Sequence, residues 1–351
     1  MASISTQDAR ALFTKMLIAT YKERVAPSSF FRSFFKEKVS STLELSIEVQ
    51  RGTEKIAVDV ERGTEGNRNS FSRSTEKIFI PPYYREYFDA TQLSLYDRLF
   101  GDTSIDSGVF SAFLEQVAEK IMMLQDKIDR AYEKQCADVL TTGIVSLQGG
   151  TNIDFKRKAA SLLDLTTINA NRYWTDNTNS TPYEDLLTGC KFIREVGKST
   201  GATLNAIMGA TALNTFLSNT KVKDRADIRN YSLDNINAPQ KASTGASLHG
   251  QVSVGSYNVN LWSYPDIYEA NGVATPYMDE KKVIILPENP NFVMGFGVVP
   301  QLATLGMPVK GKFVVSDYTD ERNASHIYDV KSAGVAIPVG VDQIYTVKVV
   351  A

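Results

Sequence analysis

Residues 107–141 carry the longest helical pattern in this 351-residue chain. A helix rises about 1.5 Å per residue, so the segment predicts a rod of roughly 50 Å, which is long for a globular protein. Apolar residues recur there mostly at steps of three or four: Phe110, Phe113, Leu114, Val117, Ile121, Leu124, Ile128, Tyr132, Cys136 and Val139. The opposite face has mixed charges: Glu115, Glu119, Lys120, Asp126, Lys127, Asp129, Arg130, Glu133 and Lys134. Such a mixture indicates a solvated, salt-bridging surface rather than a catalytic array.

A two-stranded ribbon is predicted over residues 43–80, because apolar and polar residues alternate there. The alternating apolar positions are Leu43, Leu45, Ile47, Val49, Ile56, Val58, Val60, Ile78 and Ile80. Residues 61–77 are rich in Gly, Ser, Asn and Arg and almost free of aliphatic side chains. They cannot form a core of their own, so we expect a mobile tip that reaches a partner through Arg62, Arg68 and Arg73. The alternative is a loop that is merely solvated.

An aromatic segment, "SSFFRSFFKEK" at 28–38, precedes the ribbon. Read as a helix that begins after Ser29, it places four phenylalanines on one face: Phe30, Phe31, Phe34 and Phe35. This face either packs into the core of the chain or, with Arg32, forms a contact between subunits. Upstream, residues 5–24 place Leu12, Phe13, Met16, Leu17 and Tyr21 at helical spacing. This amphipathic arm is expected to pack against protein rather than a membrane surface, because its polar side carries acids beside its lysines.

Composition argues against several classes of function. The 38 basic and 40 acidic residues nearly cancel, so specific DNA binding is not expected. The two cysteines, Cys136 and Cys190, lie far apart, and the two histidines, His249 and His326, lie outside any zinc-site or hydrolase motif. No apolar run of 18 residues is present, so no membrane helix is expected. We therefore expect no enzyme, no metal and no cofactor.

The second half of the chain has a mixed α and β pattern. A helix is expected from Pro182 to Lys198, with proline in its first turn, followed by a strand at 202–209 and a helix through Phe216. Short strands separated by Gly and Pro turns are expected at 252–264, 281–287, 292–299, 310–315 and 343–350.

The order of these elements resembles the major capsid proteins of tailed phages with the Hong Kong ninety-seven type fold, and among them the lambda-like protein E group. The resemblance covers nearly the whole chain and rests on several motifs in a shared order. They are "SSFFRSFFKEK" before "LELSIEVQ", "YEKQCADVLTTGIVSLQGG", "YWTDNTNSTPYEDL", "NAIMGATALNTFLSN" and "VNLWSYPDIYEANGVATPYMDEKKVIILP".

The resemblance implies an α+β capsid fold with named parts. These are an N-terminal arm at 1–42, an extended E-loop at 43–80, a peripheral domain at 81–179 with a spine helix at 107–141, an axial domain at 180–300, and C-terminal strands at 301–351 that complete both domains. On this reading the phenylalanines would be buried where the arm meets neighbouring subunits. Each buried Phe contributes on the order of 1.5 to 3 kcal/mol.

The resemblance also implies a function and partners. The chain is expected to assemble in the host cytoplasm, as hexamers and pentamers, into an icosahedral virion shell close to packaged double-stranded DNA. A separate scaffolding protein, a portal and a decoration protein are the implied partners. Lys55 and Lys77 lie in the ribbon, yet no asparagine partner for a covalent cross-link is evident in the sequence. The alternatives are an encapsulin-like bacterial shell and, further off, a soluble hydrolase that uses paired carboxylates.

Overall fold

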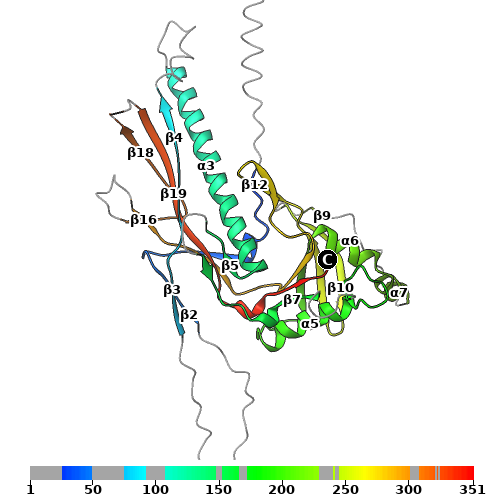
Figure 1. Ribbon diagram of the computed structural model, residues 1–351. Coiled ribbons are helices and arrows are strands. Elements are labelled where there is room, and N and C mark those ends of the chain that lie inside the picture. The colour runs from blue at the N-terminus through cyan, green and yellow to red at the C-terminus, as the bar shows by residue number, and fades with distance from the viewer. Residues whose placement is uncertain are drawn as a thin grey trace, which may run out of the picture.

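The computed structural model describes residues 26–49, 75–91, 107–147, 152–165, 172–228, 240–241, 245–300, 308–320, 322 and 325–351. The mixed α+β architecture has two main sheets, and one long helix lies along the first of them (Figure 1). The expected arm helix at 5–24 and residues 61–74 of the expected ribbon tip lie outside the described residues.

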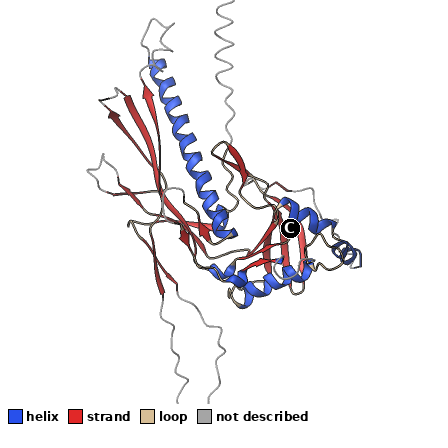
Figure 2. Ribbon diagram, in the orientation of Figure 1, coloured by secondary structure: helices blue, strands red, loops and turns tan. Residues whose placement is uncertain are grey.

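The long helix α3 spans Ser107–Thr141, the bounds that the sequence predicts. Its apolar stripe packs on a five-stranded sheet in which β19 pairs with β15, β18 and β4, and β1 pairs with β15 (Figure 2). The strands of this sheet are β1 (Phe35–Val39), β4 (Tyr83–Thr91), β15 (Phe292–Phe296), β18 (Val314–Asp320) and β19 (Ser325–Pro338). The sequence pattern had not predicted β4 or β19.

A seven-stranded mixed sheet forms the second half, in the order β7-β20-β14-β8-β11-β10-β9. Its strands are β7 (Leu162–Asp164), β8 (Thr203–Met208), β9 (Gln240–Lys241), β10 (Ser247–Val254), β11 (Tyr257–Ser263), β14 (Lys282–Pro287) and β20 (Tyr345–Lys348). The helices α5 (Pro182–Glu195) and α6 (Ala210–Ser218) cover one face, and α7 (Thr220–Ile228) follows α6. As expected, Pro182 opens α5, which ends three residues before Lys198.

Both faces of the second sheet are buried at its centre. Leu204 and Ala206 of β8 pack in a core with α5 and α6, whereas Ile207 belongs to the core that contains α3 and β19. The successive side chains of a strand point to opposite faces, so β8 joins both cores. The α3 core therefore connects the two main sheets.

Four short hairpins and three single turns complete the described fold. The hairpins are β2 (Leu45–Val49) with β3 (Thr75–Phe79), β5 (Ile144–Val145) with β6 (Ile153–Asp154), β12 (Ile267–Ala270) with β13 (Val273–Pro276), and β16 (Val298–Pro300) with β17 (Pro308–Lys310). The 3₁₀ turns are η1 (Arg32–Phe34), η2 (Ala159–Ser161) and η5 (Val341–Gln343). The β2–β3 pair confirms the predicted antiparallel base of the ribbon, with β3 beginning at Thr75, inside the range predicted for the tip.

Candidate assembly site

The aromatic segment does not form the predicted helix. It makes only the single turn η1, and then enters strand β1 at Phe35. Ser29 does not cap a helix with its side chain; instead its carbonyl accepts the backbone N–H of Ser33 at 3.1 Å. The prediction was wrong because residues 35–39 pair in parallel with β15, and this tertiary pairing overrides the local helical pattern.

Three of the four phenylalanines are buried within the chain itself. Phe31 is 0% exposed, Phe30 and Phe35 are each 4% exposed, and Phe34 is half-buried. The ring of Phe31 packs edge-on to the ring of Tyr264, with the two ring centroids 4.8 Å apart. Phe30 packs against Trp262, and Phe35 packs against Phe292. We call residues 28–35 together with their contacts the arm junction.

Glu133 of α3 holds the backbone of the arm junction. Its carboxylate accepts the N–H of Phe31 at 2.7 Å and the N–H of Arg32 at 3.0 Å, and it also accepts the hydroxyl of Tyr264 at 3.0 Å. The side chain is fully buried, so its assignment to a solvated face was wrong. Burial raises the pKa of Glu133 above its ordinary value, while the N–H donors act in the opposite direction.

A small ion network surrounds this carboxylate. Arg32 donates to Asp129 of α3 at 2.5 Å, and Lys312 lies within 3.4 Å of Asp129 and 3.1 Å of Glu37. Arg32 and Asp129 are each only 15% exposed, which reduces solvent screening of the pair. The network therefore fixes the last part of the arm to α3 and to the loop before β18.

The sequence contained one signal for the role of Glu133. Cys136 and Ala137, at the positions three and four residues later, are small and apolar, and both are buried in the same core. An acid with such neighbours on its own helix face is a candidate for a buried, hydrogen-bonded carboxylate.

The base of the ribbon exposes apolar side chains. Ile78 is 59% exposed and Ile80 is 64% exposed, beside Leu43 at 58%. Leu45 is buried and lies over Gly295, where a Cβ would meet the leucine side chain at 2.7 Å. The hairpin is therefore attached to the body at Leu45. Arg62, Arg68 and Arg73 lie outside the described residues.

A buried charge cluster on β18, β19 and β4 was not expected from the sequence. Asp329 is 0% exposed and pairs with Arg85 at 2.9 Å and with Lys331 at 3.1 Å, and it also accepts a hydrogen bond from the hydroxyl of Ser316. A buried carboxylate is tolerated only when it is paired and hydrogen-bonded, so this cluster holds three strands in register.

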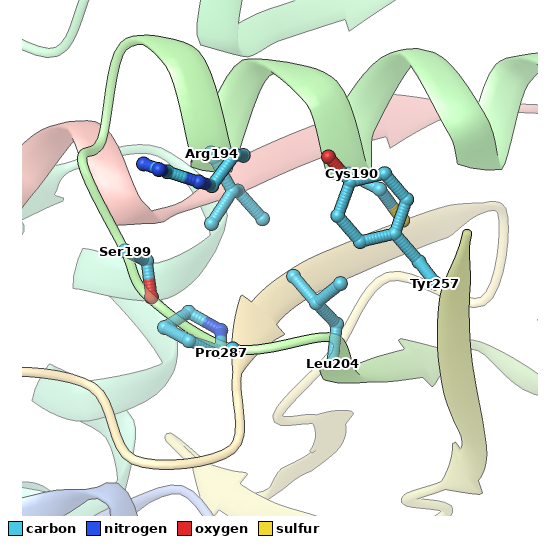
Figure 3. Close-up of a pocket in the computed structure, with 8 residues that line it drawn as sticks. Cys190, Arg194, Ser199, Leu204, Tyr257 and Pro287 are labelled. Carbon is cyan, nitrogen blue, oxygen red and sulfur yellow. The ribbon is translucent and has the colours of Figure 1, made fainter.

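Figure 3 shows a small hollow between α5 and the second sheet. Cys190, Arg194, Ser199, Leu204, Tyr257 and Pro287 are among its lining residues. None of the eight lining residues is an acid or a histidine. Burial raises the pKa of Cys190 to about 12, so its thiol is a poor nucleophile at neutral pH. The hollow therefore lacks an acid–base pair.

Within the described part of the chain, no three His, Cys, Asp or Glu side chains gather in a way that would hold a metal ion. None of the helices that the structure describes is both long and apolar enough to cross a bilayer.

Comparison with family models decides between the alternatives. The model of the phage major capsid protein E family matches residues 15–349. The chain belongs to the phage major capsid protein E family. It is therefore a phage capsid protein, a structural component of the virion rather than an enzyme. The family favours a phage shell over an encapsulin-like one. No curated protein matches the chain by sequence.

The chain is similar to several solved structures. A protein of Escherichia coli CFT073 described as a prophage capsid protein has a TM-score of 0.61 and 16% identity, with 100% of each chain covered. The mature capsid of bacteriophage PhiM1 has a TM-score of 0.49 and 13% identity, with 93% of this chain and 89% of that chain covered. The SrpI encapsulin of Synechococcus elongatus PCC 7942 has a TM-score of 0.47 and 10% identity, with 99% of this chain and 96% of that chain covered. The family protein thus has the Hong Kong ninety-seven type fold, as predicted.

Proposed function

We propose that this capsid protein assembles as hexamers and pentamers into the icosahedral head of a tailed phage, around double-stranded DNA. Support comes from the exposed apolar base of the ribbon, where Leu43, Ile78 and Ile80 are each more than half exposed. They lie in or next to the β2–β3 hairpin, which pairs only with itself among the described strands. Such a surface is characteristic of a protein–protein interface. Assembly would take place in the host cytoplasm, with a scaffolding protein and a portal as partners and a decoration protein on the finished shell.

The experiment is co-expression of the chain with the scaffold gene beside it, followed by sedimentation and electron microscopy. Closed particles that contain hexamers and pentamers are expected. A folded monomer at high concentration, in every combination with its scaffold, would contradict the proposal. An Ile78→Ser, Ile80→Ser double variant should fold but give fewer particles, whereas Leu162→Ser, at a 39% exposed position of β7, is the matched control.

We propose a division into domains that follows the two sheets. The arm is 1–42, the E-loop is 43–80, the peripheral domain begins at 81, and the axial domain begins at 180. Residues 301–351 complete both halves, which is supported by the presence of β18 and β19 in one sheet and β20 in the other. Since β15 at 292–296 pairs with β1 and β19, we move the end of the axial domain from 300 to the loop between β14 and β15.

We propose that the aromatic segment serves assembly by fixing the arm to α3. The subunit itself covers three of the four phenylalanines and part of the fourth: Phe30, Phe31, Phe35 and, in part, Phe34. Asp129 forms an ion pair with Arg32. Replacing Phe31 and Phe34 together with serine should abolish particles. Circular dichroism then separates the two roles: loss of folded signal supports the core role, whereas a folded variant that cannot assemble supports a contact between subunits.

For the ribbon tip, we propose that Arg62, Arg68 and Arg73 pair with acidic residues of an adjacent subunit. Exposed pairs are individually weak and are screened by salt, so the effect should appear in particle stability rather than in folding. Changing all three to serine and comparing particle melting at low and high salt tests this. Unchanged melting in both conditions would instead support a solvated loop.

A further inference from the structure

The turn between β12 and β13 carries the only asparagine in the sequence that a glycine follows, Asn271–Gly272. Both residues have a positive φ, 52° and 78°, as the two central residues of a type I′ hairpin turn do. Asparagine and glycine adopt this backbone at the lowest cost, so the pair suits the turn that joins Ala270 to Val273. The same pair is also chemically labile, because an asparagine amide is lost most readily when glycine follows it.

The turn is open to solvent. Asn271 and Gly272 are both exposed, and the next residue, Val273, is 64% exposed. A Cβ built at Gly272 would meet no atom of the described structure within 4 Å. Among the described residues, neither the side-chain amide of Asn271 nor the N–H of Gly272 has a hydrogen-bond partner. The hairpin projects from the body of the subunit (Figure 1), so the atoms that would react are uncovered and free to move.

The reaction requires only these two residues and water. The backbone nitrogen of Gly272 attacks Cγ of Asn271, the new N–Cγ bond forms and the Cγ–Nδ2 bond breaks. Nδ2 leaves as ammonia, carrying the proton of the attacking N–H, and a five-membered cyclic imide remains. One water then opens the imide: attack at Cγ gives aspartate, whereas attack at the main-chain carbonyl gives isoaspartate. Glycine has no side chain to hinder the attacking nitrogen, and no oxidant or reductant takes part.

Another exposed asparagine, Asn179, shows the protected case. Its side-chain amide donates to Oδ2 of Asp176 at 2.8 Å. The residue after it, Ser180, is 0% exposed, and its N–H donates to the carbonyl of Asp176 at 3.1 Å. Hydrogen bonds therefore hold both the leaving group and the attacking nitrogen at this site. Exposure alone does not make an asparagine reactive, and Asn271 differs in having neither atom held.

We propose that Asn271 is a site of spontaneous deamidation, at which the folded subunit converts its own asparagine to aspartate and isoaspartate. The new carboxylate lies two residues from Glu269, an exposed acid of the same hairpin. The isoaspartyl product also adds one backbone carbon to a turn that closes over two residues, so Ala270 and Val273 lose their register. The reaction requires no assembly step, so the proposal can fail while the capsid function holds.

The altered hairpin adjoins the arm junction. The ring of Tyr268 in β12 has its centroid 5.0 Å from that of Tyr277, and Tyr277 stacks on Tyr264 at 5.9 Å. Tyr264 donates its hydroxyl to Glu133 and packs on Phe31. Deamidation therefore changes a hairpin that supports one side of this aromatic cluster.

Peptide mapping of the purified full chain tests the proposal. One sample is incubated in native buffer at mildly alkaline pH and a second in urea, and both are digested at acidic pH. Mass spectrometry that separates aspartyl from isoaspartyl peptides gives the conversion at each asparagine. Native Asn271 should convert within about tenfold of its rate in urea, and at least about tenfold faster than native Asn179. Stronger protection of Asn271 by the fold, or faster conversion at any other asparagine, would overturn the proposal.

The pH dependence and one variant test the mechanism. The rate at Asn271 should rise about tenfold per pH unit, since the deprotonated nitrogen is the nucleophile and its fraction grows in that proportion. A rate independent of pH would contradict attack by this nitrogen. Asn271→Gln should reduce isoaspartate in the native chain at least about tenfold, because its imide would be a six-membered ring that closes slowly. Asn258→Gln, at another exposed asparagine, is the matched control and should leave the yield unchanged.

Circular dichroism verifies that both variants fold. Undiminished isoaspartate in Asn271→Gln would place the modification at another residue and overturn the proposal.

Discussion

Gly143 and Arg157 are packed in direct contact: a Cβ at Gly143 would lie 2.4 Å from the Cδ of Arg157. The guanidinium of Arg157 donates to the carbonyls of Leu140, Ser161 and Ile344, each at 3.1 Å. Ser161 directly precedes β7 and Ile344 directly precedes β20, so Arg157 joins the C-terminal end of α3 to the starts of two strands of the second sheet. The carbonyls at the end of a helix favour such a cation. Burial lowers the pKa of Arg157 to about 10, which leaves it charged at neutral pH.

Gly143→Ala should therefore destabilise the protein by about 2 to 4 kcal/mol. The added methyl group displaces Arg157, and the φ of +79° at this position disfavours any side chain. Urea denaturation of the purified subunit measures the loss. Gly311→Ala is the control, because the nearest atom to its added Cβ lies at 3.4 Å. Similar losses in the two variants would contradict this account.

The stability contributed by Glu133 should depend on pH. Burial raises its pKa in the folded state, so the folded protein binds this proton more tightly than the unfolded chain does. The contribution is fully present below the unfolded pKa and declines as pH rises through the raised folded pKa. In the Glu133→Gln variant the side chain at this position carries no titratable group. The unfolding free energy of wild type minus that of the variant should thus decrease as pH rises from about 4, near the ordinary pKa of a glutamate, measured by urea denaturation at each pH. A difference that grows with pH would show that the charged form is the favoured one.

Phe31→Ala should cost about 3 to 5 kcal/mol of folding free energy, because its ring is fully buried between α3 and Tyr264. Phe34→Ala should cost only about 1 kcal/mol, since Phe34 is half-buried and its ring contact is with Phe30. The two midpoints of chemical denaturation, read by circular dichroism, give the comparison. A larger loss for Phe34 would mean that the packing of the segment differs from that described.

Asp329→Asn should destabilise the subunit by about 3 kcal/mol, because Lys331 would stay buried without a counter-charge while Arg85 can turn to solvent. Asp89→Asn, an exposed position on β4, should change stability by less than about 0.5 kcal/mol. Thermal unfolding of the three proteins under the same conditions provides the measurement. Equal midpoints for wild type and Asp329→Asn would show that the buried pair adds no net stability.

The parts of the fold that sequence patterns predicted are those that periodicity or flanking turn residues mark. Helix α3 and strands such as β8 were placed correctly because periodicity or flanking glycines mark them. Strand β19 was missed because ten consecutive residues, Asp329–Pro338, are buried on both faces and do not alternate. The charged pair Asp329 and Lys331 inside it also makes the segment look unlike a core strand.

The arm junction was predicted only in part, because its elements come from distant parts of the sequence. Glu133 and Phe31 are 102 positions apart, and neither pattern indicates the other. The aromatic residues pointed to a buried face, which was correct, but the strand that replaces the helix depends on β15, more than 250 residues later. Local propensity cannot include a partner strand at that distance.

The order of the strands also determines when a newly made subunit becomes complete. Strand β19 lies at the centre of the first sheet, between β15 and β18 and beside β4, and β20 lies between β14 and β7 in the second. Both come late in a chain that the ribosome makes from its N-terminus. Neither half can close its sheet while those residues are still being translated, so a nascent chain carries an arm and a ribbon without a finished body. Subunits should therefore enter assembly only after β19 and β20 have been synthesised, which prevents chains that lack these strands from being built into the shell.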